Sequence, residues 1–203
     1  MGLLLNYFNK LKPNTELDRS ISDAILGHAK VDTCETFCRD NWTEEGVYLY
    51  KFDSWFVPYR EQKINSHFVL PRQDAFSSGF SGCAMARFLN FKGTEIHVAH
   101  IWLRSEYEEG DRRMDWISFC ERNPYNRDFR IFRPKAYKNM FDFNFIICKC
   151  GLISSDRRMF DVTIIIDEDK KFRFSKIEEN KPSFKGSKSK FLPQCKMDFY
   201  KNK

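Results

Sequence analysis

The fold is decided by the stretch 47–59, Val47-Tyr48-Leu49-Tyr50-Lys51-Phe52 and Trp55-Phe56-Val57-Pro58-Tyr59, with Asp53-Ser54 between the two runs. Aromatic and β-branched residues favour strands because they pack well on a pleated surface. Further strands are predicted at 67–70, 83–91, 94–103, 129–132, 141–150, 160–166 and 172–174. The predicted fold class is therefore α+β, a mixed or antiparallel β-sandwich flanked by a few helices.

Two helices are predicted from apolar residues at helical spacing. The first covers about 14–30 with Thr15 as its cap, and residues before Pro13 are expected to be loosely held. The second covers 105–123 and ends at Pro124. No internal repeat is apparent, so 203 residues predict a single domain over 1–203. The Lys-rich segment 181–203 is predicted to be solvated and partly extended.

The composition excludes general disorder and selects no partner by itself. Hydrophobic residues make up 42% of the chain, which is enough to build a core. The net charge of +6 fits an acidic protein surface, nucleic acid or a membrane face. Basic and aromatic residues alternate in 129–133, 172–174 and 181–203, as on a stacking platform or on ordinary amphipathic strands. Because no RNP-type, KH or helix-turn-helix signature is present, nucleic acid is not an expected partner.

The cysteines and the first residues indicate a reducing compartment. Seven cysteines is an odd number, so they cannot all pair. The start Met1-Gly2-Leu3-Leu4-Leu5 has no basic flank, so we predict no cleavable signal peptide. No window approaches the roughly 18 apolar residues of a membrane span. The expected location is the cytoplasm, or a host cytosol if the protein is secreted.

Metal binding is weighed against ordinary packing for two cysteine pairs. Cys34 and Cys38 can share a helical face, and Cys148 and Cys150 can share a strand face. Zinc sites normally contain C-x₂-C pairs or closely placed histidines, which this chain lacks. We therefore predict no metal and no organic cofactor.

The clearest candidate for chemistry is the tripeptide Ser81-Gly82-Cys83, which ends a stretch rich in glycine and serine that starts at Phe76. A cysteine on a tight glycine turn has little steric cover and suits a thiolate nucleophile. Gly79 and Gly82 allow a tight turn whose exposed amides can form an oxyanion hole. The competing interpretation is a small buried cysteine after a turn, since free cysteine is among the most buried residue types.

Two histidines follow in the next predicted strand, on the other arm of a probable hairpin. Side chains alternate along a strand, so Ile96, Val98, His100 and Trp102 share one face, and Glu95, His97, Ala99 and Ile101 share the other. The first face is the more apolar, which favours His100 as the buried base beside Cys83. His97 is the alternative base and is expected to face solvent or a supporting group.

The stretch 76–103 resembles the active-site pattern of glutamine deamidases, which include the cytotoxic necrotizing factor toxins, the Burkholderia lethal factor type and the chemoreceptor glutamine deamidases. In those toxins the nucleophile lies in a Ser-Gly-Cys turn, as Ser81-Gly82-Cys83 does here. The segment Ala99-His100-Ile101-Trp102-Leu103 is similar to the histidine segment of the chemoreceptor enzymes. Several members carry a threonine six residues before the cysteine, where this chain has Ser77. The fold implied by the resemblance is a β-sandwich flanked by helices.

The resemblance implies a hydrolase, a protein glutamine deamidase that works through a thioester intermediate without a cofactor. It implies Cys83 as nucleophile, His100 as base, Ser77 as an orienting group, and the turn at Ser81 and Gly82 as the oxyanion site. It also implies a bacterial toxin or secreted effector, with a virulence role, that acts on a host protein. Two alternatives stay open: another Cys–His activity, such as a papain-like protease or a transglutaminase, and a non-catalytic β-sandwich that binds a partner.

Overall fold

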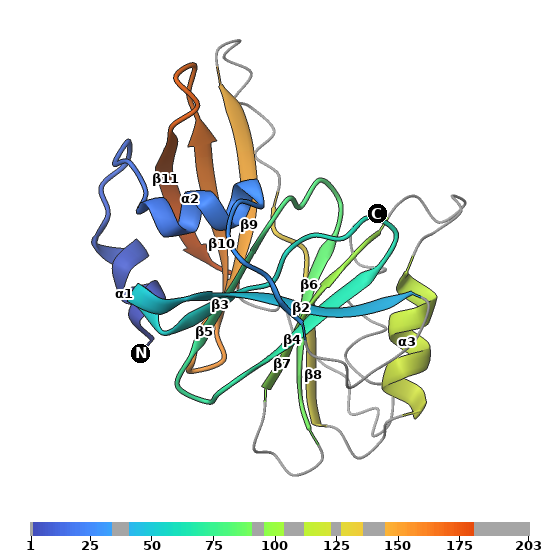
Figure 1. Ribbon diagram of the computed structural model, residues 1–203. Helices are drawn as coiled ribbons and strands as arrows, with labels where there is room; N and C mark the ends of the chain where they lie inside the picture. The colour runs from blue at the N-terminus through green and yellow to red at the C-terminus, as the bar shows by residue number, and fades with distance from the viewer. Residues whose placement is uncertain are drawn as a thin grey trace.

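The structure is a computed structural model that describes residues 2–33, 41–90, 96–103, 112–122, 127–135 and 145–180. It contains eleven strands and three α-helices, so the α+β prediction is confirmed (Figure 1). The helices are α1 (Leu3–Lys10), α2 (Arg19–Leu26) and α3 (Arg113–Arg122). The strands are β1 (Asp32–Thr33), β2 (Trp42–Leu49), β3 (Ser54–Phe56), β4 (Ile64–Val69), β5 (Asp74–Ser78), β6 (Ala84–Leu89), β7 (Ile96–Ile101), β8 (Arg127–Phe132), β9 (Ile146–Ile153), β10 (Met159–Ile166) and β11 (Phe172–Glu179).

All strands belong to one curled sheet, so the predicted sandwich of two stacked sheets is not confirmed. The strand order is β11-β10-β9-β5-β3-β2-β4-β7-β6-β8, with β1 paired to β2. The pairs β2–β4 and β3–β5 are parallel and the others are antiparallel, so the sheet is mixed. Its curl forms a half-barrel, with β8 and β11 at the two ends of the strand order.

Both faces of the sheet carry apolar side chains, and both are buried: the inner face by the curl of the sheet and the outer face by the helices. The inner face holds a core cluster to which strands from both ends of the sheet contribute, among them Ala75, Met85, Val98, Ile153 and Met159. The outer face of one half packs under α1 and α2, and the outer face of the other half packs under α3. Alternate residues of β6 and β7 fall into the inner cluster and into the cluster under α3, so the predicted strand parity is confirmed.

The N-terminal helices differ from the prediction. Residues before Pro13 are not loosely held, because they form α1, whose Leu4, Leu5 and Phe8 are fully buried. The Asp74 carboxylate anchors the start of α1 by accepting a hydrogen bond from the backbone N–H of Leu5 at 2.8 Å. The helix predicted over about 14–30 is α2, and it begins later than predicted. Asp18 rather than Thr15 accepts the capping hydrogen bond.

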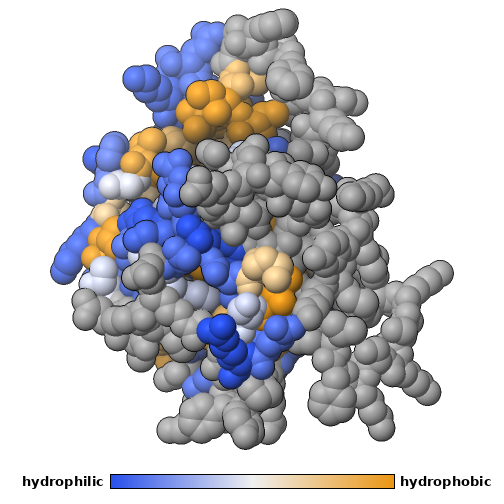
Figure 2. Space-filling view, turned by 90° about the vertical axis from the view of Figure 1, so that its right-hand side faces the viewer, coloured by the Kyte–Doolittle hydropathy of each residue, from blue (hydrophilic) through white to orange (hydrophobic). Residues whose placement is uncertain are grey.

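The helix α3 covers the outer face of β6, β7 and β8 through Trp116, Ile117, Phe119 and Cys120. It lies on the right of Figure 1, and the face of the molecule on that side carries a band of hydrophilic side chains below a cluster of hydrophobic ones (Figure 2). Four predicted segments lie outside the described residues. They are the turn at Lys92-Gly93, residues 105–111 of the helix predicted over 105–123, residues 141–144 of the strand predicted over 141–150, and the Lys-rich segment 181–203. No described helix has the length and apolar character that would let it cross a membrane.

Candidate active site around His100

Cys83 and His100 lie on the same face of the β6–β7 hairpin. The two strands pair antiparallel, with Met85 opposite His100 and Ala84 opposite Ile101. Continuing this register places Cys83 opposite Trp102, so Cys83 and His100 are diagonal neighbours, with Cα atoms roughly 7–8 Å apart by the usual sheet spacing. Cys83 is only 3% exposed and belongs to the inner cluster.

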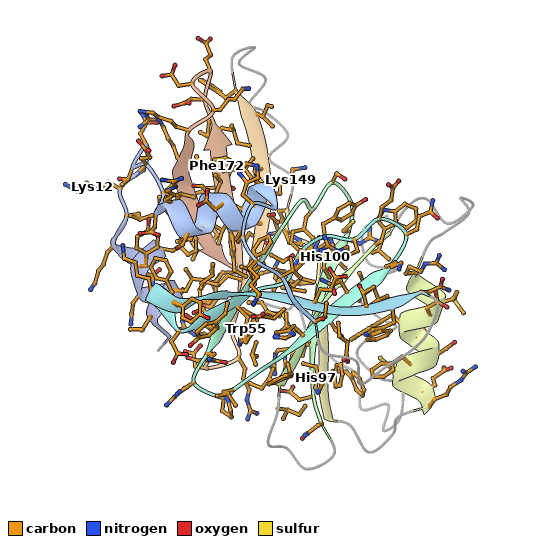
Figure 3. The ribbon with its side chains drawn as sticks, viewed as in Figure 1. Lys12, Trp55, His97, His100, Lys149 and Phe172 are labelled. Atoms are coloured by element: carbon orange, nitrogen blue, oxygen red, sulfur yellow. The ribbon has the colours of Figure 1, made fainter. Side chains whose placement is uncertain are left out.

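His97 lies on the opposite face of the same hairpin. It pairs with Phe88, and the two rings stack with centroids 4.7 Å apart, next to the cluster under α3. Figure 3 shows His97 and His100 at well-separated heights along β7. Of the two expected surroundings of His97, solvent is wrong, because the side chain is 8% exposed and packs on Phe88. The sheet itself separates His97 from Cys83.

Ser77, which lies on β5 across the inner face of the curled sheet from β7, fixes the tautomer of His100. Ser77 on β5 is fully buried, and its hydroxyl donates to the carbonyl oxygen of Val57 at 2.6 Å. The same oxygen lies 2.8 Å from Nδ1 of His100. A hydroxyl has a single proton, so with that proton given to Val57 the bond to His100 requires Nδ1–H to be the donor. Nε2 of His100 therefore carries the lone pair.

Burial keeps this imidazole neutral. His100 is 1% exposed, and burial lowers the pKa of His100 to about 3. Its Nε2 is buried and has no hydrogen-bond partner within the described part of the chain, so the structure does not hydrogen-bond the thiol of Cys83 to His100. A neutral imidazole with an unused acceptor is the state from which a histidine can accept a proton.

Aromatic rings hold His100 on both sides. Phe80 stacks on the imidazole with ring centroids 4.2 Å apart and an interplanar angle of 6°. Tyr59 meets the imidazole edge-on at 5.4 Å, and its hydroxyl oxygen accepts a hydrogen bond of 2.9 Å from the indole N–H of Trp102. Tilting the imidazole out of its plane would break both ring contacts, so the rings fix that plane, and the bond to Ser77 fixes which nitrogen faces β5.

The turn that carries Cys83 is anchored at one end and exposed at the other. The backbone N–H groups of Gly79 and Phe80 donate to the carbonyl oxygen of Lys149 on β9, at 3.1 and 3.3 Å. Gly79 has φ of +83° and Gly82 has φ of +150°, conformations that suit glycine. Ser81 and Gly82 are exposed whereas Phe80 and Cys83 are buried, so the predicted oxyanion site lies at the surface directly next to the buried thiol.

The cysteine pair on β9 is close but does not complete a metal site. The Sγ atoms of Cys148 and Cys150 are 3.7 Å apart, and both thiols are free. Among the described residues, no group of three or more potential ligands is close enough to hold a metal. Cys34 and Cys38 lie outside the described residues.

The aromatic residues of the predicted basic–aromatic strands are buried in the core: Phe129, Phe132, Phe172 and Phe174.

Sequence reasoning missed three parts of this site. The strand β5 overlaps at residues 76–78 with the stretch 76–83, in which glycines and serines predict a turn. The stacking role of Phe80 had a weak signal, a single apolar residue between the glycines of the turn. The backbone oxygens of Val57 and Lys149 carry no sequence signal at all, since any residue supplies a carbonyl.

Comparisons of the chain with protein-family models, with curated proteins and with solved structures found no match.

Proposed function

We propose that this protein is a cysteine-dependent amidohydrolase that converts a glutamine side chain of another protein to glutamate. The observation that supports this best is the pair of hydrogen bonds at Ser77, because they leave an unprotonated Nε2 on the sheet face that carries Cys83. In this proposal Cys83 is the nucleophile, His100 is the general base, and Ser77 is a positioning residue.

The reaction begins with transfer of the Cys83 thiol proton to Nε2 of His100. The thiolate attacks the carboxamide carbon, and the backbone amides at Gly82 and Cys83 stabilise the negative charge that develops on the oxygen. The imidazolium then returns its proton to the departing ammonia, which leaves a thioester on Cys83. Water hydrolyses the thioester with His100 as base, and the product is a glutamate side chain.

Burial supports glutamine rather than a main-chain amide as the substrate. Cys83 and His100 are 3% and 1% exposed, and Phe80 stacks over the imidazole. A primary carboxamide at the end of a flexible side chain reaches a buried thiol more readily than a peptide bond within a chain, which needs an open groove. The resemblance of 76–103 to glutamine deamidases points to the same substrate, and it is the basis for proposing a toxin or secreted effector that acts on a host protein.

The test is to incubate the full chain with a terminally blocked Gln-Gly peptide and to follow ammonia release and peptide mass. We expect ammonia and a mass increase of about one unit, which is the result of replacing the amide by a carboxylate through a thioester. Cys83→Ala should abolish the reaction, whereas Cys120→Ala, a matched buried cysteine on the opposite face, should retain it.

Two further variants separate positioning from structure. His100→Asn keeps an N–H donor toward Ser77 but removes Nε2, and it should lower kcat by about 10²–10⁴-fold. Ser77→Ala should lower kcat with little change in KM, and Ser77→Thr, which keeps the hydroxyl, should recover much of the loss. A cleaved peptide would identify a protease instead, and incorporation of an added amine would identify a transglutaminase. Wild-type turnover by Cys83→Ala would refute Cys83 as the nucleophile.

A further inference from the structure

A charged pocket lies at the opposite end of β6 from Cys83, where the two ends of the curled sheet approach each other. One wall consists of residues from β6 and β8, and the other consists of the turn between β9 and β10 and the end of β11. Its volume is about 380 Å³, which is in the range of small-molecule sites. The proposed amidohydrolase reaction uses none of its residues.

Three arginines surround the carboxylate of Asp128 in this pocket. Asp128 Oδ2 lies 2.6 Å from Nη1 of Arg87 and 3.9 Å from Nη1 of Arg157, and Asp128 Oδ1 lies 3.0 Å from Nε of Arg130. Burial alone would raise the pKa of the Asp128 carboxyl, but the hydrogen bonds and charges of Arg130 and Arg87 together hold it below its ordinary value. Three guanidinium groups against one carboxylate make the surroundings of Asp128 positive. With Arg158, Asp156 and Glu179 included, the lining holds four arginines and three carboxylates, a net charge of +1.

The innermost of these arginines has a donor that is not used. The Arg87 side chain is 3% exposed, and its Nε has no hydrogen-bond partner among the residues that the structure describes. Burial lowers the pKa of Arg87, so the folded protein holds this charge at a cost that Asp128 offsets only in part. A buried N–H without an acceptor is unfavourable, and an oxygen atom of a ligand in the pocket would satisfy it.

The backbone on both walls is irregular where it presents these side chains. Asp128 has φ of +52° and Arg157 has φ of +69°, left-handed conformations that are uncommon for residues other than glycine. The pairing of β6 with β8 also shifts register between Arg87 and Leu89. Bulges and strained residues of this kind concentrate at binding sites, because they redirect side chains that a regular strand would point elsewhere.

We propose that this pocket binds the phosphate group of a small organic phosphate ester. The net positive charge of the pocket, concentrated around Asp128, attracts a phosphate, which carries a charge of about −1.5 to −2 at neutral pH. Guanidinium groups also match the geometry of phosphate oxygens better than ammonium groups do. On the opposite wall Glu179 and Asn180 offer polar atoms to the hydroxyl groups of the ester, and Met159 offers an apolar contact.

The test is calorimetric titration of the full chain with inorganic phosphate, ribose 5-phosphate, ribose and malonate. We expect saturable binding of both phosphates, tighter for ribose 5-phosphate, and no binding of ribose. Arg130→Gln and Arg157→Gln should each weaken phosphate binding by about tenfold or more, as expected for loss of a charged hydrogen bond. Arg19→Gln, at an exposed arginine on α2, is the matched control and should bind as the wild type does.

The proposal has clear contrary outcomes. It is overturned if neither phosphate binds saturably, if the double variant Arg130→Gln/Arg157→Gln binds as tightly as the wild type, or if malonate binds as tightly as ribose 5-phosphate. The urea midpoint of each variant shows whether it folds. Arg157→Gln changes a side chain that is 47% exposed, so this variant alone can decide the question if the double variant is unstable.

Discussion

Burial and one hydrogen bond together set the protonation state of His100. Ser77 fixes which nitrogen carries the proton, and the surrounding rings exclude the water that would stabilise an imidazolium. The two effects differ in what they do: the hydrogen bond makes Nε2 the basic nitrogen, whereas burial keeps it neutral and lowers its basicity. The imidazolium formed during the proposed reaction is therefore stabilised only while a negative thiolate lies near it.

The same burial makes the stability of the fold depend on pH. The pKa of His100 is about 3 in the folded protein against 6.5 for the free side chain, so only the unfolded chain gains a proton between these values. This contribution to stability is complete above pH 6.5 and is lost as the pH falls toward 3, at about 1.4 kcal/mol per pH unit. His67, whose pKa burial lowers to about 4, acts in the same direction.

We therefore expect the unfolding free energy of His100→Asn to fall less steeply than that of the wild type between pH 6.5 and pH 4.5. The slope should be smaller by about 1.4 kcal/mol per pH unit, the value for one proton. Urea titrations at a series of pH values measure this. His28→Asn, at an exposed histidine, should leave the slope as it is in the wild type. A wild-type slope retained by His100→Asn would mean that His100 can be protonated in the folded state.

At the scale of elements, Asp74 ties three parts of the fold together. Its carboxylate lies at the start of β5 and accepts hydrogen bonds from Leu5 at the start of α1 and from Ser155 in the β9–β10 turn, at 2.8 and 2.7 Å. A Cβ atom added to Gly2 would fall 1.9 Å from this carboxylate. The helix can therefore dock only because position 2 has no side chain.

Gly2→Ala and Asp74→Ala should each lower the free energy of unfolding by about 2–3 kcal/mol, the first through a clash and the second by leaving buried N–H groups unsatisfied. Because both changes disrupt the same contact, the double variant should be less destabilised than the sum of the two. Urea midpoints of the four proteins form the double-mutant cycle. Simple additivity would show that Gly2 and Asp74 act independently.

The elements that the sequence predicts best are those in which the spacing of apolar residues shows which side chains are buried. The run 47–59 and the alternation in 96–102 identify β2, β3 and β7 because the apolar residues repeat at the strand period. The predicted strand 47–52 is wrong at its end, because Tyr50–Phe52 form a 3-10 helix. The prediction failed for β5, where buried serines belong to a polar site, and for α1, whose docking depends on Asp74 far along the chain. The curl of the sheet also could not be predicted, since it follows from the order of strands and not from any one strand.

At the scale of the molecule, the inner cluster joins two outer cores that share no helix. The core under α3 contains Trp42 and Trp116, and the inner cluster contains Trp102 with Trp55 packed against it. The core under α1 and α2 has aromatic residues but no tryptophan. Tryptophan fluorescence therefore reports on the half with α3 and on the interior, whereas far-UV circular dichroism reports on the whole chain.

We expect urea unfolding curves from these two signals to coincide, because strands from both halves pack in the inner cluster and one half cannot unfold without exposing it. The measurement is a paired titration on one sample of the full chain. An earlier transition by circular dichroism would show that the half with α1 and α2 unfolds on its own.

The hydrogen bond between Ser77 and His100 has a consequence for how such a site can arise during evolution. The cysteine and the histidine belong to one hairpin, whereas the serine lies on β5, separated from β7 in the strand order by β3, β2 and β4. Two substitutions in a hairpin are enough to place a thiol and an imidazole on one face of it. The third partner is gained only in an ancestor whose sheet already curls, so the architecture must precede an efficient catalyst rather than follow it.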